Sequence, residues 1–287
     1  MDICKLDLHM HTTVSDGTDT PKEILARVRE AGIRCFSVTD HDAIKSAMIL
    51  REDLKKDDPT CITGVEFSCR DDYGKYHILG YGYDPCGESI TQLMEKGHAF
   101  RMRKVKARLA KLKEIFNVTF PEEELKTLLS RDNPGKPHVG NLMVKYGYAR
   151  TKDEAIHEYI NKAKVKSEHL TPEETIEGIL LSGGIPVLAH PCFGDGNQLI
   201  LGEELKERID RLVKMKLAGV EAFYSGFTEE HTLPLLELAD QYDLYVTAGS
   251  DYHGTNKTVK LGDVGILDLS REIPGLAAFL KDVNTIN

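Results

Sequence analysis

Short apolar runs alternate with amphipathic, helix-like stretches along most of this chain of 287 residues. Each apolar run has the length of one strand and is bounded by glycine, proline or charged residues. Strands are predicted within residues 5–11, 34–43, 61–69, 75–83, 185–190, 219–225 and 244–254. Strands separated by helices predict an α/β fold with a parallel, barrel-like sheet, whose active site should lie where the strands end.

The helix boundaries carry clear capping signals. In TPKEILARVREAGI, Thr20 is placed as the N-cap, Pro21 as the first helical residue, and Gly32 as the stop. Thr171 has the same capping position in TPEETIEGILL, which ends before Gly183 and Gly184. Each of these helices precedes a predicted strand, as the alternating α/β pattern requires.

Between residues 90 and 170 the chain changes to long, charged, helix-like segments. The stretch from Lys96 to Lys113 contains eight Lys or Arg and no acidic residue, with apolar residues at roughly helical spacing. We interpret residues 90–170 as a helical insertion subdomain over the active site. Residues 1–89 and 171–287 then form the barrel. Within the insertion, Lys136 and His138 are predicted to lie in a turn ahead of another helix.

The composition narrows the class of protein. With 41% hydrophobic and 29% charged residues, the chain is typical of a globular protein. It has neither an apolar run of roughly 18 residues nor a signal peptide, so we expect a cytoplasmic protein without a membrane partner. A net charge of −9 argues against general coating of nucleic acid. The cysteines are scattered and are expected to be reduced and mostly buried: Cys4, Cys35, Cys61, Cys69, Cys86 and Cys192.

Histidines and carboxylates recur at or near the predicted strand ends. His9 and His11 are two residues apart, so in a strand their side chains emerge on one face and could bind one ion together. A buried cluster of imidazoles and carboxylates would be costly unless cations neutralised it. Nitrogen and oxygen donors without thiolate suit Mn, Zn or Fe in a multinuclear site. The candidates are His9, His11, Asp16, Asp40, His41, Glu66, His77, His190, Asp251 and His253.

The motifs HMH, TDHD, HILGY, LAHP and GSDYHG, with Asp16 and Glu66 between them, stand in the order found in one family. Over nearly its whole length the chain resembles the PHP (polymerase and histidinol phosphatase) superfamily of metal-dependent phosphoesterases. The resemblance implies a distorted (β/α)7 TIM-like barrel holding two or three divalent metal ions, with Mn²⁺ favoured over Fe²⁺ or Zn²⁺. It also implies that Asp7 and Asp40 orient ligand imidazoles.

The same resemblance assigns the metal ligands. One ion would be held by His9, His11, Glu66 and Asp251; a second by Glu66, His77 and His190; and a third by Asp16, His41 and His253. A hydroxide bridging the metals would be the nucleophile. The implied catalytic residues are therefore His9, His11, Glu66, Asp251 and His253, acting through the metals.

Within the superfamily, GKPHVGNLM and LSGGIPVLAHP resemble the branch of nucleoside 3',5'-bisphosphate phosphatases and TrpH-like exoribonucleases. The expected activity is hydrolysis of phosphate monoesters of small nucleotides, or of the 5' end of short oligoribonucleotides. Lys136 stands where that branch usually has Arg before Pro-His. We expect four residues of the insertion to bind the substrate phosphate: Lys136, His138, Arg101 and Arg103.

Other functions remain open from the sequence. The substrate could be another small metabolite, such as a histidinol phosphate-like compound or a cyclic phosphate diester. Metal hydrolases of C–N bonds also open with a His-x-His strand, but they usually add a bridging carboxylated lysine, which is not evident here. A non-catalytic, metal-stabilised binding module is the alternative of a different class.

Overall fold

The computed structural model describes residues 5–194, 198–265 and 273–287. The chain forms two compact units, which are described separately. The barrel unit comprises the chain up to Met94 and Leu170–Asn287, and the helical unit comprises Glu95–His169. One long helix, α3 (Glu88–Phe116), begins in the first unit and continues into the second.

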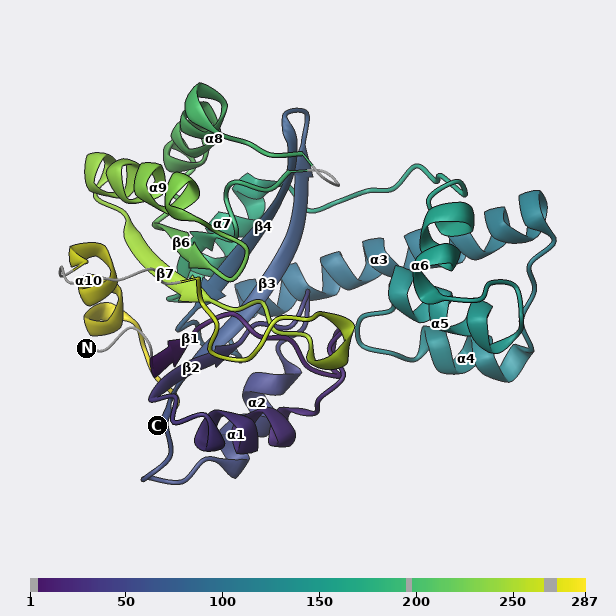
Figure 1. Ribbon diagram of the computed structural model, residues 1–287, viewed down its shortest axis with the longest axis horizontal. Helices are drawn as coiled ribbons and strands as arrows, with labels where there is room; N and C mark the ends of the chain where they lie inside the picture. Colours follow the sequence, from purple (N-terminus) through teal and green to yellow (C-terminus); the bar gives the residue numbers. More distant parts are fainter. Residues whose placement is uncertain (1–4, 195–197, 266–272) are drawn as a thin grey trace. The chain divides into compact units, whose positions relative to one another are not determined.

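The barrel unit contains a seven-stranded sheet in which the strands follow one another in chain order (Figure 1). All the predicted strands form, and the expected TIM-like α/β barrel is confirmed. Their bounds are β1 Leu6–Asp7, β2 Cys35–Val38, β3 Thr60–Asp71, β4 Gly74–Tyr81, β5 Ile185–Leu188, β6 Gly219–Tyr224 and β7 Tyr245–Gly249.

The expectation of a wholly parallel sheet was wrong, because β4 runs antiparallel to both β3 and β5. Only two residues separate β3 from β4, which is too short for the crossover that parallel strands need. The Asp71 carboxylate closes the turn by accepting from the backbone N–H of Tyr73 at 2.8 Å and of Gly74 at 3.0 Å. Glu66 and His77 therefore lie within the two strands of a long hairpin, not at strand ends.

The sheet nearly closes on itself through the segments that follow β1 and β7. The Leu8 N–H donates to the Ala248 carbonyl at 3.0 Å, and the His11 N–H donates to the Tyr252 carbonyl at 2.8 Å. In return, the Asp251 N–H donates to the His9 carbonyl at 2.8 Å. The two stretches that carry the HMH and SDYH motifs are thus held side by side by backbone hydrogen bonds.

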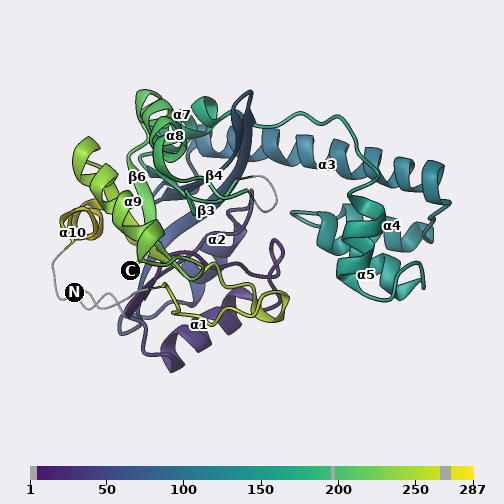
Figure 2. The ribbon, with the colours of Figure 1, turned by 45° about the horizontal axis from the view of Figure 1, so that its top comes forward.

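Helices flank the sheet, with α1 and α2 beside β1 and β2, and α8 and α9 near β6 (Figures 1 and 2). The predicted N-caps of α1 and α7 are present. Thr20 and Thr171 each accept from the third helical N–H, and a glutamate completes each capping box. The helices are α1 Pro21–Glu30, α2 Lys45–Asp53, α7 Pro172–Leu181, α8 Gly202–Lys214, α9 Glu229–Tyr242 and α10 Pro274–Asp282, with a short 3-10 helix at Gly254–Asn256.

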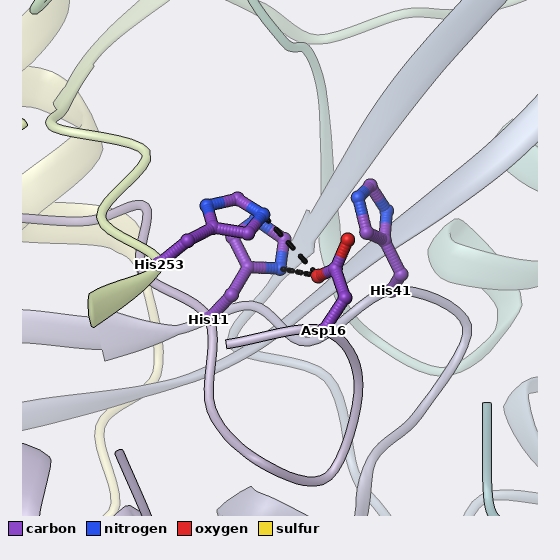
Figure 3. Close-up of side chains that lie close together, drawn as sticks. All are labelled: His11, Asp16, His41 and His253. Carbon is purple, nitrogen blue, oxygen red and sulfur yellow. Dashed lines mark ion pairs between the residues drawn. The ribbon is translucent and has the colours of Figure 1, made fainter. Parts of the chain in front are cut away.

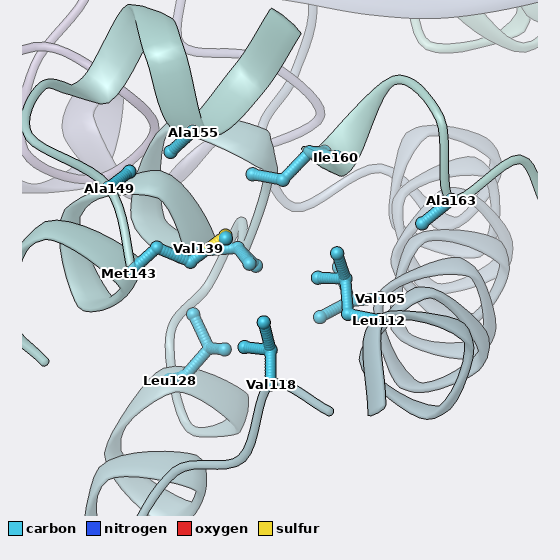
Figure 4. Close-up of a cluster of buried hydrophobic side chains, with 10 residues drawn as sticks. All are labelled: Val105, Leu112, Val118, Leu128, Val139, Met143, Ala149, Ala155, Ile160 and Ala163. Atoms are coloured by element: carbon cyan, nitrogen blue, oxygen red, sulfur yellow. The ribbon is translucent and has the colours of Figure 1, made fainter. Parts of the chain in front are cut away.

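The helical unit has a hydrophobic core of its own (Figure 4). Val105 and Leu112 of α3 pack against side chains from the shorter helices, among them Met143. Lys136 is the first residue of α5, so the KPH segment forms the first turn of this helix. The prediction that it lies in a turn ahead of the helix was wrong. The shorter helices are α4 Glu122–Leu129, α5 Lys136–Lys145, α6 Lys152–Glu154 and a π-helical turn at Ala155–Ile160.

The described cysteines agree with the expectation of mostly buried thiols. Cys35, Cys61, Cys69 and Cys192 are buried, whereas Cys86 is exposed. Burial raises the pKa of Cys35 and Cys192 to about 12. Cys4 lies outside the described residues. Within the described residues, no helix is long and apolar enough to span a membrane.

Candidate metal centre

The predicted ligands of the barrel unit lie in one cluster, although they come from six different strands and the loops after them. His9 and His11 follow β1, His41 follows β2, and His190 follows β5. The first two imidazoles are completely buried, whereas Asp16, His77 and His190 are partly exposed. The cluster consists of His9, His11, Asp16, His41, Glu66, His77, His190, Asp251 and His253.

The deepest part of the cluster joins β1 to β3 and β7. His11 Nε2 lies 3.2 Å from His9 Nε2, 3.2 Å from Glu66 Oε2 and 3.3 Å from Asp251 Oδ1. His9 Nε2 is 3.4 Å from the same Glu66 oxygen and 3.6 Å from the same Asp251 oxygen. Two imidazole nitrogens and two carboxylate oxygens therefore converge on one small volume.

Glu66 connects this part of the cluster to the imidazoles of the hairpin and of β5. Its Oε1 lies 2.8 Å from His77 Nδ1 and 3.3 Å from His190 Nε2. Its Oε2, the atom that faces His9 and His11, also lies 3.1 Å from His41 Nδ1. One carboxylate thus has a different set of imidazoles on each oxygen, which is the arrangement of a bridging ligand.

A third group lies around Asp16, in the loop after β1 (Figure 3). Asp16 Oδ1 is 3.2 Å from His253 Nε2 and 3.8 Å from His11 Nδ1. The rings of His11 and His253 are stacked, with centroids 4.0 Å apart, and the His11 and His41 centroids are 4.6 Å apart. His11 therefore takes part in two groups, which the sequence did not predict.

The donor set fits divalent cations. When two ligands each lie about 2.1 Å from one ion at right angles, they are about 3 Å apart, and the distances given above are close to this value. Glu66 Oε2 is buried and makes no hydrogen bond with the described residues, so it can accept a cation. The donors in the three groups are imidazole nitrogens and carboxylate oxygens, as Mn, Fe or Zn sites use.

The electrostatics of the buried imidazoles point to the same conclusion. Burial by itself would lower the pKa of His11, but the adjacent carboxylates of Asp251 and Glu66 outweigh it and raise this pKa to about 9. The pKa of His9 is likewise raised, because Glu221, Glu66 and Asp251 outweigh the effect of its burial. Protons on these imidazoles balance the carboxylates, and a bound cation would take their place.

Glu221 is a functional candidate that the sequence reasoning missed. It is fully buried in β6, and its Oε1 accepts from His9 Nδ1 at 2.9 Å. Its Oε2 accepts from the His190 backbone N–H at 2.8 Å. Because a carboxylate only accepts, Glu221 keeps a proton on His9 Nδ1, and Nε2 is the atom that faces the cluster and would release its proton to a cation. The available signal was a lone glutamate inside the apolar run GVEAFY.

The predicted role of Asp7 and Asp40 as imidazole-orienting carboxylates was wrong. Asp7 accepts from the backbone N–H groups of His9, Ser250 and Gly262, and from the Ser250 hydroxyl. Asp40 accepts from the hydroxyls of Thr12, Ser15 and Ser46 and from the Thr12 N–H. In the described chain both carboxylates bind the loops that carry the ligands, not the ligand rings.

Two ligand candidates have an unusual backbone conformation. His190 has φ +28° and Asp251 has φ +57°, a left-handed region that residues with a Cβ seldom adopt. The His190 N–H is held by Glu221, and the Asp251 N–H by the His9 carbonyl. Strain of this kind is typical of functional positions, where neighbouring groups hold the backbone in place.

The predicted phosphate-binding residues lie in the helical unit. His138 Nδ1 accepts from the Gly135 N–H at 3.2 Å and so caps α5. Lys136 Nζ donates to Asn161 Oδ1 at 2.7 Å, and Arg103 forms an ion pair with Glu168 at 2.6 Å. Arg101 lies in α3 of the same unit. Their role in substrate binding stays a prediction.

Comparison with known proteins now gives the family. A family model described as the PHP domain matches residues 7–179, which is more than half of the chain. The chain belongs to the PHP domain family. Six of the nine cluster residues of this PHP protein lie within the matched span. The other three, His190, Asp251 and His253, come from later in the chain but join the same cluster.

Several curated proteins are similar to this PHP protein along most of their length. A 5'-3' exoribonuclease of Haemophilus influenzae is 27% identical over 261 residues, covering 90% of this chain and 93% of that protein. A phosphoribosyl 1,2-cyclic phosphate 1,2-diphosphodiesterase of Eggerthella lenta is 27% identical, with 86% and 94% covered. A 3',5'-nucleoside bisphosphate phosphatase of Chromobacterium violaceum is 23% identical, with 88% of each chain covered.

Solved structures show the same fold. A protein from Bifidobacterium adolescentis, assigned as a metal-dependent phosphoesterase, superposes with a TM-score of 0.79 at 26% sequence identity. The match covers 96% of each chain. The likeness therefore includes both the strands and the inserted helices of this PHP protein.

Proposed function

We propose that this chain is a metal-dependent phosphoesterase that hydrolyses phosphate esters of small nucleotides or of short RNA. The proposal rests above all on Glu66, whose two oxygens each face imidazoles of the cluster. Clusters of this composition are suited to holding adjacent cations that act on one substrate. Relatives named as an exoribonuclease, a cyclic phosphate diesterase and a phosphatase support phosphate-ester chemistry.

The cluster would hold two or three divalent ions, with Mn²⁺ favoured over Fe²⁺ or Zn²⁺. When bound, such ions neutralise charge on the phosphate oxygens and provide a nucleophile that is competent at neutral pH. Glu66 would be the shared ligand. His9 and His11 with Asp251 would complete one set, and the remaining residues two further sets: His77 with His190, and Asp16 with His41 and His253.

Residues around the cluster would orient a metal ligand, exclude water and leave a side open to the substrate. Glu221 keeps the His9 proton on Nδ1, so that Nε2 is available to a cation. Burial of His9 and His11 excludes water from the inner side of the cluster. The partly exposed His77 and His190 form the side from which a substrate can approach.

The finer substrate assignment follows from the kind of phosphate that must be bound. A terminal phosphate on a nucleoside 3',5'-bisphosphate or on the 5' end of short RNA carries two negative charges, which cationic side chains bind well. We assign this binding to Lys136, His138, Arg101 and Arg103 of the helical unit. The activities of the named relatives support such substrates.

The proposal is tested by loading the purified protein with Mn²⁺ and assaying a panel of substrates. The panel contains phosphomonoesters, nucleoside 3',5'-bisphosphates, cyclic nucleotides and short 5'-phosphorylated RNA. Hydrolysis of at least one class is expected, with at least ~10³-fold loss in His9→Ala and Asp251→Ala. Glu237→Gln, which removes an exposed carboxylate of α9, is the control and should retain full activity.

Two results would overturn the proposal. One is a protein that binds Mn²⁺ but hydrolyses nothing in the panel, which is the behaviour of a binding module. The other is full activity of Asp251→Ala under metal-loaded conditions, which would place the chemistry outside this cluster. Circular dichroism spectra of both alanine variants establish that they remain folded.

A further inference from the structure

Lys257 lies at the edge of the metal cluster, in the segment that follows His253. Its Nζ is 2.5 Å from Asp251 Oδ2, and its side chain is 39% exposed. The other oxygen of Asp251 faces inward, 3.3 Å from His11 Nε2. A single carboxylate therefore separates the Lys257 ammonium from the ligand atoms of the deepest group.

Asp251 does not depend on Lys257 for its orientation. The Tyr224 hydroxyl donates to the same Oδ2 at 2.8 Å. The Asp251 backbone is held by the hydrogen bond from its N–H to the His9 carbonyl, at 2.8 Å. If the Lys257 side chain turned away, Tyr224 would still fix the outer oxygen of Asp251.

The backbone near Lys257 is anchored beside the cluster. The Asn256 side chain donates to the Asp16 carbonyl at 2.7 Å, and the Thr255 N–H donates to the Thr18 hydroxyl at 2.9 Å. Both bonds tie this segment to the loop that carries Asp16. The lysine thus combines a fixed attachment point with a long side chain that reaches solvent, as a ligand-binding lysine requires.

The charges indicate what Lys257 binds. Asp251 carries one negative charge, and a cation held at its inner oxygen would draw on that charge and weaken the pair with Lys257. The carboxylate of Asp251, shared with that cation, then neutralises the Lys257 ammonium only in part, so a further anion beside Lys257 would be stabilised. We propose that Lys257 binds a phosphate oxygen of the substrate, on the solvent side of Asp251. This assignment rests on the proposed function, and it adds a phosphate ligand from the barrel unit itself.

The experiment measures binding of inorganic phosphate to the Mn²⁺-loaded protein by isothermal titration calorimetry, with metal content determined on the same samples. Lys257→Met should weaken phosphate binding by about 10- to 100-fold, as the loss of one charge-assisted hydrogen bond would. Its metal content should equal that of the wild type. Lys257→Arg should restore most of the affinity, because guanidinium also binds phosphate.

The control is Lys260→Met, which removes an exposed lysine three residues further along and should leave phosphate binding unchanged. Loss of metal in Lys257→Met, with unchanged phosphate affinity per loaded site, would overturn the proposal and make Lys257 a positioning residue for Asp251. Unchanged binding and metal content would also overturn it.

The phosphate measurement also separates this proposal from the proposed function. If the wild type hydrolyses no ester but Lys257→Met weakens phosphate binding, the proposed function is refuted and the role of Lys257 in phosphate binding is supported. If the wild type is active but Lys257→Met binds phosphate as well as the wild type does, the function is supported and the role of Lys257 is refuted.

Discussion

His9 Nδ1 lies 2.9 Å from Glu221 Oε1, and both side chains are completely buried. The second oxygen of Glu221 accepts from the backbone N–H of His190 at 2.8 Å. One carboxylate of β6 therefore fixes the ring of a ligand after β1 and the backbone of a ligand after β5. We infer that Glu221 couples two of the proposed metal sets without binding a metal itself.

Replacing Glu221 with glutamine tests this coupling. An amide has one acceptor oxygen, so Glu221→Gln places its NH₂ group against either the His9 or the His190 N–H. Mn²⁺ affinity should fall by about 10- to 100-fold, as for other groups that orient metal ligands. Calorimetric titration with Mn²⁺ measures the effect, and Glu237→Gln is the charge-matched control. Wild-type affinity in Glu221→Gln would show that the hydrogen bonds do not position the ligands.

Gly249 provides the space for this pair. A Cβ at this position would lie 2.1 Å from His9 Cβ and 2.7 Å from Glu221 Oε1. Gly249→Ala should therefore displace His9 and lower both metal affinity and stability, the latter by about 1–3 kcal/mol as in other overpacked cores. Chemical denaturation and metal analysis give the two values. Gly135→Ala, where the backbone is extended and an added Cβ would come no closer than 3.6 Å to a residue beyond its chain neighbours, separates the loss of glycine from the clash. Equal behaviour of the two variants would contradict this account.

The pH dependence of metal binding follows from His11. Its pKa of about 9 in the metal-free protein lies above the ordinary value of 6.5. Protonated His11 therefore stabilises the metal-free fold below pH 6.5, and this contribution is lost as the pH rises through 9. Because a cation must displace that proton, Mn²⁺ affinity should rise by up to about tenfold per pH unit between pH 6.5 and 8.5.

Calorimetry in two buffers of different ionisation enthalpy measures the protons released at each pH. At pH 7.5 at least one proton should leave per protein on Mn²⁺ binding, with fewer released as the pH approaches 9. Binding without proton release at pH 7.5 would contradict the assignment of His11 as a ligand.

Substitution of His138 tests whether this residue only stabilises α5 or also binds the substrate. Its Nδ1 caps α5, so His138→Ala should cost about 1 kcal/mol of stability. If His138 also binds the substrate phosphate, the same variant should raise KM or lower kcat while metal content stays intact. Steady-state kinetics with metal analysis decide this, and His138→Asn retains a side chain that can cap the helix. Loss of metal in His138→Ala would instead make His138 a ligand.

Local patterns were enough to predict much of the fold. Thr20 and Thr171 with their prolines marked helix starts, and apolar runs marked every strand. The spacing of His9 and His11 placed both imidazoles on one face. The direction of β4 was missed although the sequence contained a signal for it. Only two residues separate Asp71 from Gly74, which is enough for a hairpin but too few for the crossover between parallel strands.

Contacts between residues far apart in sequence could not be predicted. Glu221 and His9 are hydrogen-bonded although they are 212 residues apart in the sequence. A lone glutamate in an apolar strand does not indicate which residue it will bind. Asp7 and Asp40 were assigned to imidazoles because they stand next to ligand motifs. Their actual partners, such as Ser250 for Asp7 and Thr12 for Asp40, are brought to them only by closure of the barrel and by the pairing of β1 with β2.

The central claim is that distant strands bring these imidazoles and carboxylates together around shared cations. Anomalous diffraction from crystals of the Mn²⁺-loaded protein, collected on both sides of the manganese absorption edge, tests it most directly. We predict two or three manganese peaks, with Glu66 bound to two of the ions and His9 and Asp251 bound to one of these. A single peak away from Glu66, or no peak in the cluster of a fully loaded sample, would contradict the account.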